Sequence, residues 1–367
     1  MPSQRIFNFS LIIFALLYLG ANLHSQHIHP FRTYYHEFLL VIAVFLGVGG
    51  LGFLSKRVVV FPKIAYLPLA LIVVLLGQWQ NGLVPSQNVY YPLMIFCTTL
   101  LAMVLGATWA VQVAGVEKIC LMLAAVQLLA GLLSVLMQCT QILGLNLYPV
   151  VMYLAREGAM RPFANVAQPN QLALLLCFAL ASVWCLFQAR RLRSGAAIAL
   201  AVVLLWGLAL TQSRIAWIIL PVFAVLVCTP FLGQRPLSRW PVFLLLGAFA
   251  GVVLILPEIG QLLGFASASF GERMGGRSER MVLMQQAWAM AKQHPWFGVG
   301  WFGFGAEQVN IASQFRSTTY AEHSHNLVLN LMAELGLPIA LLLLGGLVYW
   351  FYQTCWAKQA AQNNAVG

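Results

Sequence analysis

Long apolar stretches separated by short polar segments dominate the pattern of this 367-residue chain. A bilayer core about 30 Å thick requires about 20 mostly apolar residues in a helix that crosses it. The pattern therefore predicts an all-α polytopic membrane protein with about ten transmembrane helices. The ten candidate spans lie near residues 6–23, 38–54, 58–77, 90–112, 119–140, 171–188, 196–210, 215–232, 241–256 and 327–354. No small-residue cleavage site follows the first span, so we expect a retained anchor rather than a signal peptide.

The basic residues between these spans predict the orientation of the chain, because cytoplasmic loops are enriched in Lys and Arg. With the N-terminus inside, the inner segments hold Arg5, Lys56, Arg57, Lys63, Lys118, Arg190, Arg191, Arg193, Arg235, Arg239 and Lys358. The short outer loops hold only Arg32, Arg156, Arg161 and Arg214. We therefore expect a multi-pass protein with both termini in the cytoplasm.

This topology divides the chain into three parts. Residues 1–256 hold nine spans and an outer loop at 141–169, residues 257–324 form one long outer segment with short helices, and residues 325–367 hold a histidine-bearing helix, the last span and a cytoplasmic tail. Because the inner loops are short basic turns, we expect any chemistry to occur on the outer side.

Composition and charge narrow the class of protein further. The chain is 61% hydrophobic and 8% charged, which excludes a soluble globular domain. Its net charge of +11 lies in short blocks beside apolar stretches rather than in a phosphate-binding stripe, so no nucleic-acid partner is expected. The seven cysteines show no CxxC spacing and are interpreted as small buried hydrophobic residues.

Two parts of the outer segment carry candidate chemistry. Residues Glu279 to Gln293 are typical of a helix, with Ser278 as its cap, and Arg280 in the first turn favours a bound anion over helix stability. The run Gly298-x-Gly300-x-x-Gly303 matches a dinucleotide motif, but no strand precedes it, and we interpret it as a flexible lip over the bilayer.

The second candidate is the segment His323-Ser-His325-Asn326. We expect Ser324 to cap a helix that starts at His325, with the stop at Gly336 and Pro338. In that first turn the helix dipole would keep His325 neutral and able to accept a proton. Asn326, Asn330 and Glu334 then form a polar stripe, which at membrane depth indicates a water-filled cavity.

Two smaller groups remain on the outer side. Arg214 lies between two spans with almost no loop, where it either binds an anion or snorkels to the surface. The segment from Arg161 to Asn170 is rich in amides and prolines, and ordinary turn chemistry is the alternative to substrate binding. Four histidines near residue 30 (His24, His27, His29 and His36) fit no standard metal site.

The acidic residues indicate how the outer side of this chain could bind an anionic substrate group such as a diphosphate. The chain contains no aspartate, and its glutamates are scattered singly. Sites that bind a diphosphate through Mg²⁺ generally use carboxylate ligands, whereas arginine neutralises phosphate through bidentate contacts. We therefore expect no metal and no cofactor, but a cationic site with a histidine base.

At this point the residues resemble a known family. The pieces TQSRIAW and HSHNLVLNLMAELGLP, and the spacing from Arg280 through HPWFGVG, are similar to the O-antigen ligase superfamily of bacterial inner-membrane proteins. The piece RPFANVAQPNQLALLL resembles the O-oligosaccharyltransferases, which glycosylate pilin and other exported proteins. Family members usually continue through further spans, so this chain resembles a shortened member or a fragment.

The resemblance implies a glycosyltransferase that moves a glycan from undecaprenyl diphosphate to a Ser or Thr of an exported, pilin-like protein at the periplasmic face. His325 matches the essential histidine and is expected to activate the acceptor hydroxyl. Arg214 and Arg280 match arginines that hold the diphosphate, and Gln168 is expected to bind donor or acceptor. The remaining expected substrate-binding residues are Asn170, Arg161, Asn326 and Arg277.

Three alternatives stay open. The acceptor could be lipid A core, as in an O-antigen ligase, or another glycan repeat, as in a polysaccharide polymerase. His325 could act as a cation on the diphosphate. The chain could instead transport lipid-linked sugars, although no inverted repeat is apparent in the sequence.

Overall fold

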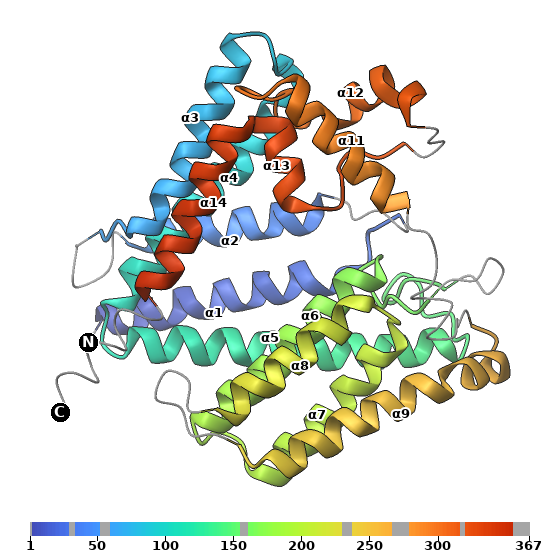
Figure 1. Ribbon diagram of the computed structural model, residues 1–367. Coiled ribbons are helices and arrows are strands. Elements are labelled where there is room, and N and C mark those ends of the chain that lie inside the picture. Colours follow the sequence, from blue (N-terminus) through green and yellow to red (C-terminus); the bar gives the residue numbers. More distant parts are fainter. Residues whose placement is uncertain are drawn as a thin grey trace, which may run out of the picture. The chain divides into compact units, whose positions relative to one another are not determined.

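The computed structural model describes residues 2–28, 34–51, 59–154, 161–229, 237–265, 279–315 and 320–354. Over these residues the regular elements are helices, which confirms the all-α prediction (Figure 1). The predicted cap Ser278 and the predicted site residue Arg277 lie outside the described residues.

The helices α1 to α9 are Pro2–Leu23 (α1), Tyr35–Leu51 (α2), Tyr66–Gln80 (α3), Tyr90–Ala110 (α4), Gly115–Ile142 (α5), Pro169–Gln188 (α6), Ser194–Leu210 (α7), Arg214–Cys228 (α8) and Arg239–Leu263 (α9). They are followed by Glu279–Gln293 (α11), Phe304–Ile311 (α12), Leu327–Leu335 (α13) and Leu337–Tyr352 (α14). Short 3₁₀ turns lie at Lys63–Ala65, Ser86–Asn88 and Ala312–Gln314.

Among the described residues, six helices are long and apolar enough to cross a membrane: Gln4–Leu23, Lys63–Gln80, Ser86–Ala110, Gly115–Ile142, Pro169–Gln188 and Arg239–Leu263. Four further apolar helices, α2, α7, α8 and α14, are shorter, with 15 to 17 residues each. A membrane protein is therefore supported, and the ten-span count remains a prediction.

Three of the predicted spans have wrong boundaries. The third predicted span starts at residue 58, but residues 59–62 are not helical, and α3 runs from Tyr66 to Gln80 after a 3₁₀ turn. The ninth predicted span stops at residue 256, but α9 continues through Pro257 and ends before Gly264, whose φ of 69° forms a left-handed cap. The tenth predicted span is not one helix, because Gly336 breaks it into α13 and α14. With nine residues, α13 rises only about 14 Å and is too short to cross a bilayer core about 30 Å thick.

The chain forms two compact units. The first consists of Met1–Val58 and Trp109–Gly275, and the second of Val59–Thr108 and Gly276–Gly367.

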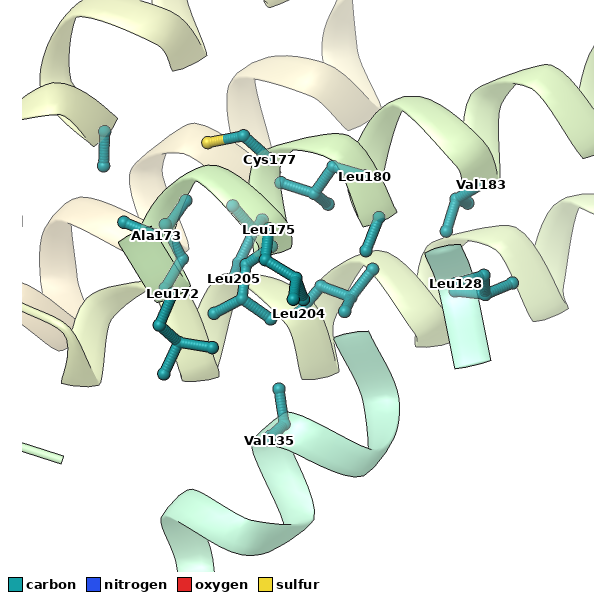
Figure 2. Packing of buried hydrophobic residues seen from close by; sticks show 14 of the residues in the cluster. Leu128, Val135, Leu172, Ala173, Leu175, Cys177, Leu180, Val183, Leu204 and Leu205 are labelled. Carbon is teal, nitrogen blue, oxygen red and sulfur yellow. The ribbon is translucent and has the colours of Figure 1, made fainter. Parts of the chain in front are cut away.

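In the first unit, α5 packs against α1, α6 and α7, and α6 also packs against α8. Figure 2 shows how leucines of α6 and α7, among them Leu172, Leu175 and Leu204, meet Val135 of α5. Leu172 and Leu204 are fully buried. This apolar packing fixes the ends of α6 and α8, where the predicted residues Asn170 and Arg214 lie.

In the second unit, α11 packs against α13, α13 contacts α14, and α14 runs beside α3 (Figure 1). A separate apolar core joins α11, α12 and α13 through buried residues that include Leu283, Met290, Phe304 and Ala333. The helix bearing Arg280 is thereby fixed relative to the helix that follows His325.

Candidate active site

The structure places His325 just before α13 rather than in its first turn. The cap is Asn326, whose side-chain oxygen accepts a hydrogen bond from the Leu329 backbone N–H at 3.1 Å. The predicted cap at Ser324 is therefore wrong. His325 itself has a left-handed backbone with a φ of 56°, which a residue inside the helix could not adopt.

Ser324 and Asn330 hold the turn around His325. Ser324 is fully buried, and its backbone N–H donates to the Asn330 side-chain oxygen at 2.9 Å. The Ser324 hydroxyl donates to the Asn326 carbonyl at 3.0 Å. The imidazole between them is exposed, with its ring centre 4.4 Å from that of His323. A rigid backbone thus presents a solvent-accessible imidazole.

The environment of His325 favours its neutral form. Partial burial lowers the pKa of the imidazole, and the neighbouring His323 and Arg280 lower it further. The predicted neutral state is therefore supported, although its predicted cause, a position in the first helical turn, is wrong. A neutral imidazole with an exposed ring can accept a proton at neutral pH.

Arg280 lies in the first turn of α11, as the sequence predicts, and its side chain is exposed. The described helix, Glu279–Gln293, ends at the predicted residue. Because Arg280 acts electrostatically on His325, the second unit brings a permanent cation close to a potential base. An anionic group bound by Arg280 would lie near the atom that accepts the proton.

The polar stripe on α13 does not face a cavity at its C-terminal end. Glu334 is 2% exposed, and its carboxyl accepts hydrogen bonds from the Phe302 and Phe304 backbone and from the Asn330 side chain. Burial nevertheless dominates and raises the pKa of this carboxyl to about 7. The expectation of water at this position is wrong, because the loop before α12 covers the carboxyl.

The glycine-rich loop that covers Glu334 is closely packed and not the flexible lip expected from the sequence. The backbone N–H groups of Val299 and Gly300 donate to the carbonyls of Ala333 and Glu334, at 2.9 and 3.1 Å. A Cβ at Gly298 would lie 2.4 Å from the Glu334 carbonyl carbon, so only glycine fits there. These bonds satisfy carbonyls that the end of α13 leaves unpaired.

Sequence reasoning missed Gln78, which fastens the same loop from α3. Its amide donates to the carbonyls of Phe297 and Glu334, at 2.9 and 2.8 Å, and accepts from the Trp301 N–H at 3.1 Å. The side chain is 4% exposed. The available signal was a pair of glutamines, Gln78 and Gln80, at the end of an otherwise apolar helix.

In the first unit the structure brings the amide-rich segment and the turn before α8 together. The Arg161 guanidinium donates to the Thr211 carbonyl at 3.0 Å, and the Ser213 hydroxyl donates to the Asn170 side-chain oxygen at 3.0 Å. Arg214 follows as the exposed first residue of α8. Arg161 and Asn170 therefore help to hold the turn from which Arg214 projects.

Gln168 and Gln141 complete this arrangement. The half-buried Gln168 caps α6 by accepting from the Gln171 N–H at 3.2 Å. Gln141 on α5, which the sequence reasoning also missed, donates to the Met152 and Ala164 carbonyls at 2.9 and 3.0 Å. Its oxygen accepts from the Phe163 and Ala164 N–H groups at 3.1 and 2.8 Å. The amide thus makes three bonds to the segment that carries Arg161 and Gln168, and a fourth to Met152.

The histidines of the first outer loop gather around His24. Its ring centre lies 4.1 Å from that of His27 and 6.4 Å from that of His36, and His36 contacts Glu37 at 2.8 Å. His29 lies outside the described residues. Within the described parts of the chain, His, Cys, Asp and Glu side chains form no group of three or more that could hold a metal ion.

The candidate site residues lie in a region that matches a known protein family. Residues 199–344, which include Arg214, Arg280 and His325, match the O-antigen ligase family. The predicted resemblance to the O-antigen ligase superfamily is confirmed. This region starts within α7 and ends within α14, so it covers both candidate arginines and the histidine turn.

Two curated relatives come from Acinetobacter baylyi (strain ATCC 33305 / BD413 / ADP1). A general O-oligosaccharyltransferase is 27% identical over 96% of this chain and 62% of the relative. A ComP-specific O-oligosaccharyltransferase is 29% identical over 50% of this chain and 34% of the relative. The chain thus spans about three fifths of the length of the first relative. No solved structure matches the chain.

Proposed function

We propose that this chain is an O-oligosaccharyltransferase. It transfers a glycan from undecaprenyl diphosphate to a Ser or Thr hydroxyl of an exported, pilin-like protein. The proposed site faces the periplasm from a bacterial inner membrane, with both termini in the cytoplasm. The observation that carries the proposal is the exposed, neutral His325 under the influence of Arg280, within a region that matches the O-antigen ligase family.

The reaction is a displacement at the anomeric carbon of the first sugar. His325 takes the proton of the acceptor hydroxyl as its oxygen forms a bond to that carbon. The bond between the carbon and the diphosphate oxygen breaks, undecaprenyl diphosphate leaves, and the configuration inverts. Positioned base catalysis of this kind contributes about 10²–10⁴-fold.

Guanidinium groups stabilise the charge that develops on the leaving diphosphate. Arg280 supplies one of them from α11, and the family resemblance assigns a second to Arg214. Both side chains are exposed, and arginine remains charged at any pH of interest. No metal ion takes part in the proposed scheme.

The other predicted residues receive more limited roles. Gln168 is proposed to bind donor or acceptor, and Arg277 stays a prediction for the same purpose. Arg161, Asn170 and Asn326 support the backbone beside Arg214 and His325, in keeping with their hydrogen bonds.

The experiment is a transfer assay with the purified chain, a lipid-linked oligosaccharide and a pilin-like acceptor, in the presence and absence of EDTA. His325→Ala should lower the rate at least 100-fold, and EDTA should have no effect. His294→Ala is the matched control, because His294 is exposed in the same unit. Full activity in His325→Ala, or loss of wild-type activity with EDTA, would overturn the proposed mechanism.

A second candidate acceptor is lipid A core, as in an O-antigen ligase. The observation that favours it is the family match itself, which carries the O-antigen ligase description. Offering both acceptors to the same preparation separates the two functions. Transfer to lipid A core alone would exclude the protein glycosylation that we propose.

A further inference from the structure

A buried carboxyl lies at one end of a hydrogen-bonded path to the His325 turn. Glu334 accepts a hydrogen bond from the Asn330 side chain and is 2% exposed. One of its oxygens, Oε1, has no hydrogen-bond partner among the described residues, so the bonds converge on the other oxygen. Burying an ionisable group costs free energy unless hydrogen bonds or a charge partner compensate for the lost water, so these hydrogen bonds hold the carboxyl in place.

Asn330 connects this carboxyl to the turn, and the donor and acceptor groups of its amide determine which end faces Glu334 and which faces Ser324. An asparagine amide has one acceptor oxygen and one donor NH₂ group. The oxygen accepts from the Ser324 N–H at 2.9 Å, which leaves the NH₂ group to donate to Glu334. A carboxyl oxygen at that position therefore fixes the amide in the orientation that Ser324 requires.

The same carboxyl also reaches the loop on its other side. The backbone at Phe302 and Phe304 donates to it, and Gln78 holds the start of that loop through Phe297 and Trp301. The glycine-rich loop and the histidine turn are thus joined through one side chain. A shift of Glu334 would move both.

We propose that Glu334 is a positioning residue, which holds the His325 imidazole in its reactive orientation through Asn330 and the Ser324 backbone. This inference rests on the proposed function, in which His325 is the base. Glu334 does not touch the substrate in this scheme. Glu334 lies at the C-terminal end of α13, whereas the His325 turn precedes the N-terminal end. Glu334 therefore acts on the orientation of the imidazole through hydrogen bonds.

The alternative is that the Glu334 carboxyl acts directly, through its charge, on the pKa of His325, and the causes of that pKa shift do not include Glu334. The charges that act on the pKa of His325 are those of His323 and Arg280, and partial burial acts more strongly than either. Removal of Glu334 should therefore change the pKa of His325 only by changing how the turn is buried. Opening the turn to water would move that pKa upward, toward its ordinary value.

The experiment compares Glu334→Leu, Glu334→Gln and Asn330→Ala with the wild-type chain. Glu307→Gln is the matched control, because Glu307 bonds Asn310 on the outer surface of α12. Two quantities are measured in the same preparations. The first is kcat and KM for glycan transfer, and the second is the pH midpoint at which diethyl pyrocarbonate modifies His325, read by tandem mass spectrometry.

We expect Glu334→Leu to lower kcat about 10- to 100-fold with KM within about twofold, and to raise the modification midpoint of His325. Glu334→Gln keeps an oxygen that can accept from Asn330, so it should recover most of kcat. Asn330→Ala should raise the midpoint in the same way, and the double variant should add little, because both residues act on one path.

Three results would overturn the inference. In the first, Glu334→Leu leaves the midpoint unchanged while kcat falls with the amount of folded protein, which is a purely structural effect. In the second, kcat stays within about twofold of wild type. In the third, the effects of Glu334→Leu and Asn330→Ala simply add. If the wild-type chain transfers no glycan but Glu334→Leu still raises the modification midpoint of His325 above that of wild type, the result would contradict the proposed function and support the positioning.

Discussion

At the residue scale, the histidine turn shows how a local backbone can set the chemistry of one side chain. Asn326 takes the cap of α13, and His325 is left outside the helix with a positive φ. Its imidazole therefore does not pack against the side chains of α13 as a helical residue would, and it is exposed. Partial burial, with a further contribution from the neighbouring His323 and Arg280, lowers the pKa of the imidazole and supports the neutral form.

This electrostatic arrangement predicts a pH effect of Arg280. A base must be neutral to act, so transfer should fall as the pH drops through the pKa of His325, which lies below its ordinary value of 6.5. His323 and Arg280 are the charges that lower it. Replacing Arg280 by Gln removes one of them, so the acid limb of kcat/KM should move to higher pH.

The measurement is the pH profile of glycan transfer for Arg280→Gln beside wild type. Lys292→Gln is the control, because Lys292 is an exposed cation at the other end of α11. We expect the control profile to match that of wild type. An acid limb for Arg280→Gln that stays in place, or that moves to lower pH, would contradict the assignment of His325 as the base.

The sequence predicted the position of the charged residues within their helices better than it predicted their contacts. Arg280 lies in the first described turn of a helix that ends at the predicted residue. Glu334, by contrast, was expected to face water because polar stripes at membrane depth usually do. The glycine loop that covers it comes from more than 30 residues earlier in the chain, and such a long-range contact leaves no local signal.

At the element scale, each unit holds its candidate loop with a buried glutamine from a long apolar helix. Gln141 of α5 does so in the first unit, and Gln78 of α3 in the second. Both amides bond mainly to backbone groups of irregular segments. Because irregular backbone away from water needs partners for its polar groups, each glutamine makes its loop possible.

Gln141→Leu tests this role. The variant would remove the hydrogen bonds that Gln141 makes with the N–H groups of Phe163 and Ala164 and with the carbonyls of Met152 and Ala164. We expect a loss of at least about 4 kcal/mol in stability, since four buried groups lose a bond and each buried group left unpaired costs about 1–3 kcal/mol. Thermal unfolding in detergent measures it, with the exposed Gln171→Leu as control. Equal midpoints for the two variants would show that the four bonds contribute nothing.

The break between α13 and α14 gives a second prediction at this scale. Gly336 has a φ of 83°, and a Cβ there would lie 2.4 Å from the Trp296 carbonyl oxygen. Gly336→Ala should therefore destabilise the fold by more than about 1 kcal/mol. Gly345→Ala in α14 meets nothing within 4 Å, and it should be neutral or stabilise by up to about 1 kcal/mol. Unfolding midpoints of the pair test this, and a stable Gly336→Ala would mean that the break tolerates a side chain.

Hydrophobic length predicted most helices because a bilayer sets a physical minimum for a span. It failed at 327–354, where the apolar stretch was long enough for one span but Gly336 and Pro338 divide it. The sequence does contain that stop. A residue count alone cannot distinguish one long helix from two helices separated by a glycine with positive φ.

At the scale of the whole molecule, the predicted roles are distributed over both compact units. Arg214 and Gln168 belong to the first unit, and Arg280 and His325 to the second. The link between Arg214 and Arg280 therefore comes from the family resemblance, and a functional measurement is the direct way to test it. If both guanidinium groups act on the same diphosphate, their removal should not be additive.

The test is a double-mutant cycle on kcat/KM for glycan transfer. Arg214→Ala and Arg280→Ala should each lower kcat/KM about 100-fold, and the double variant should lose clearly less than the product of the two effects, since both groups stabilise one charge in the transition state. Arg191→Ala combined with Arg280→Ala is the control cycle, because Arg191 lies in the first unit and pairs with Glu117 at 3.4 Å. That control should be additive. Additive losses for Arg214 and Arg280 as well would mean that they stabilise different charges, and Arg214 would then have to act on another group, such as the acceptor.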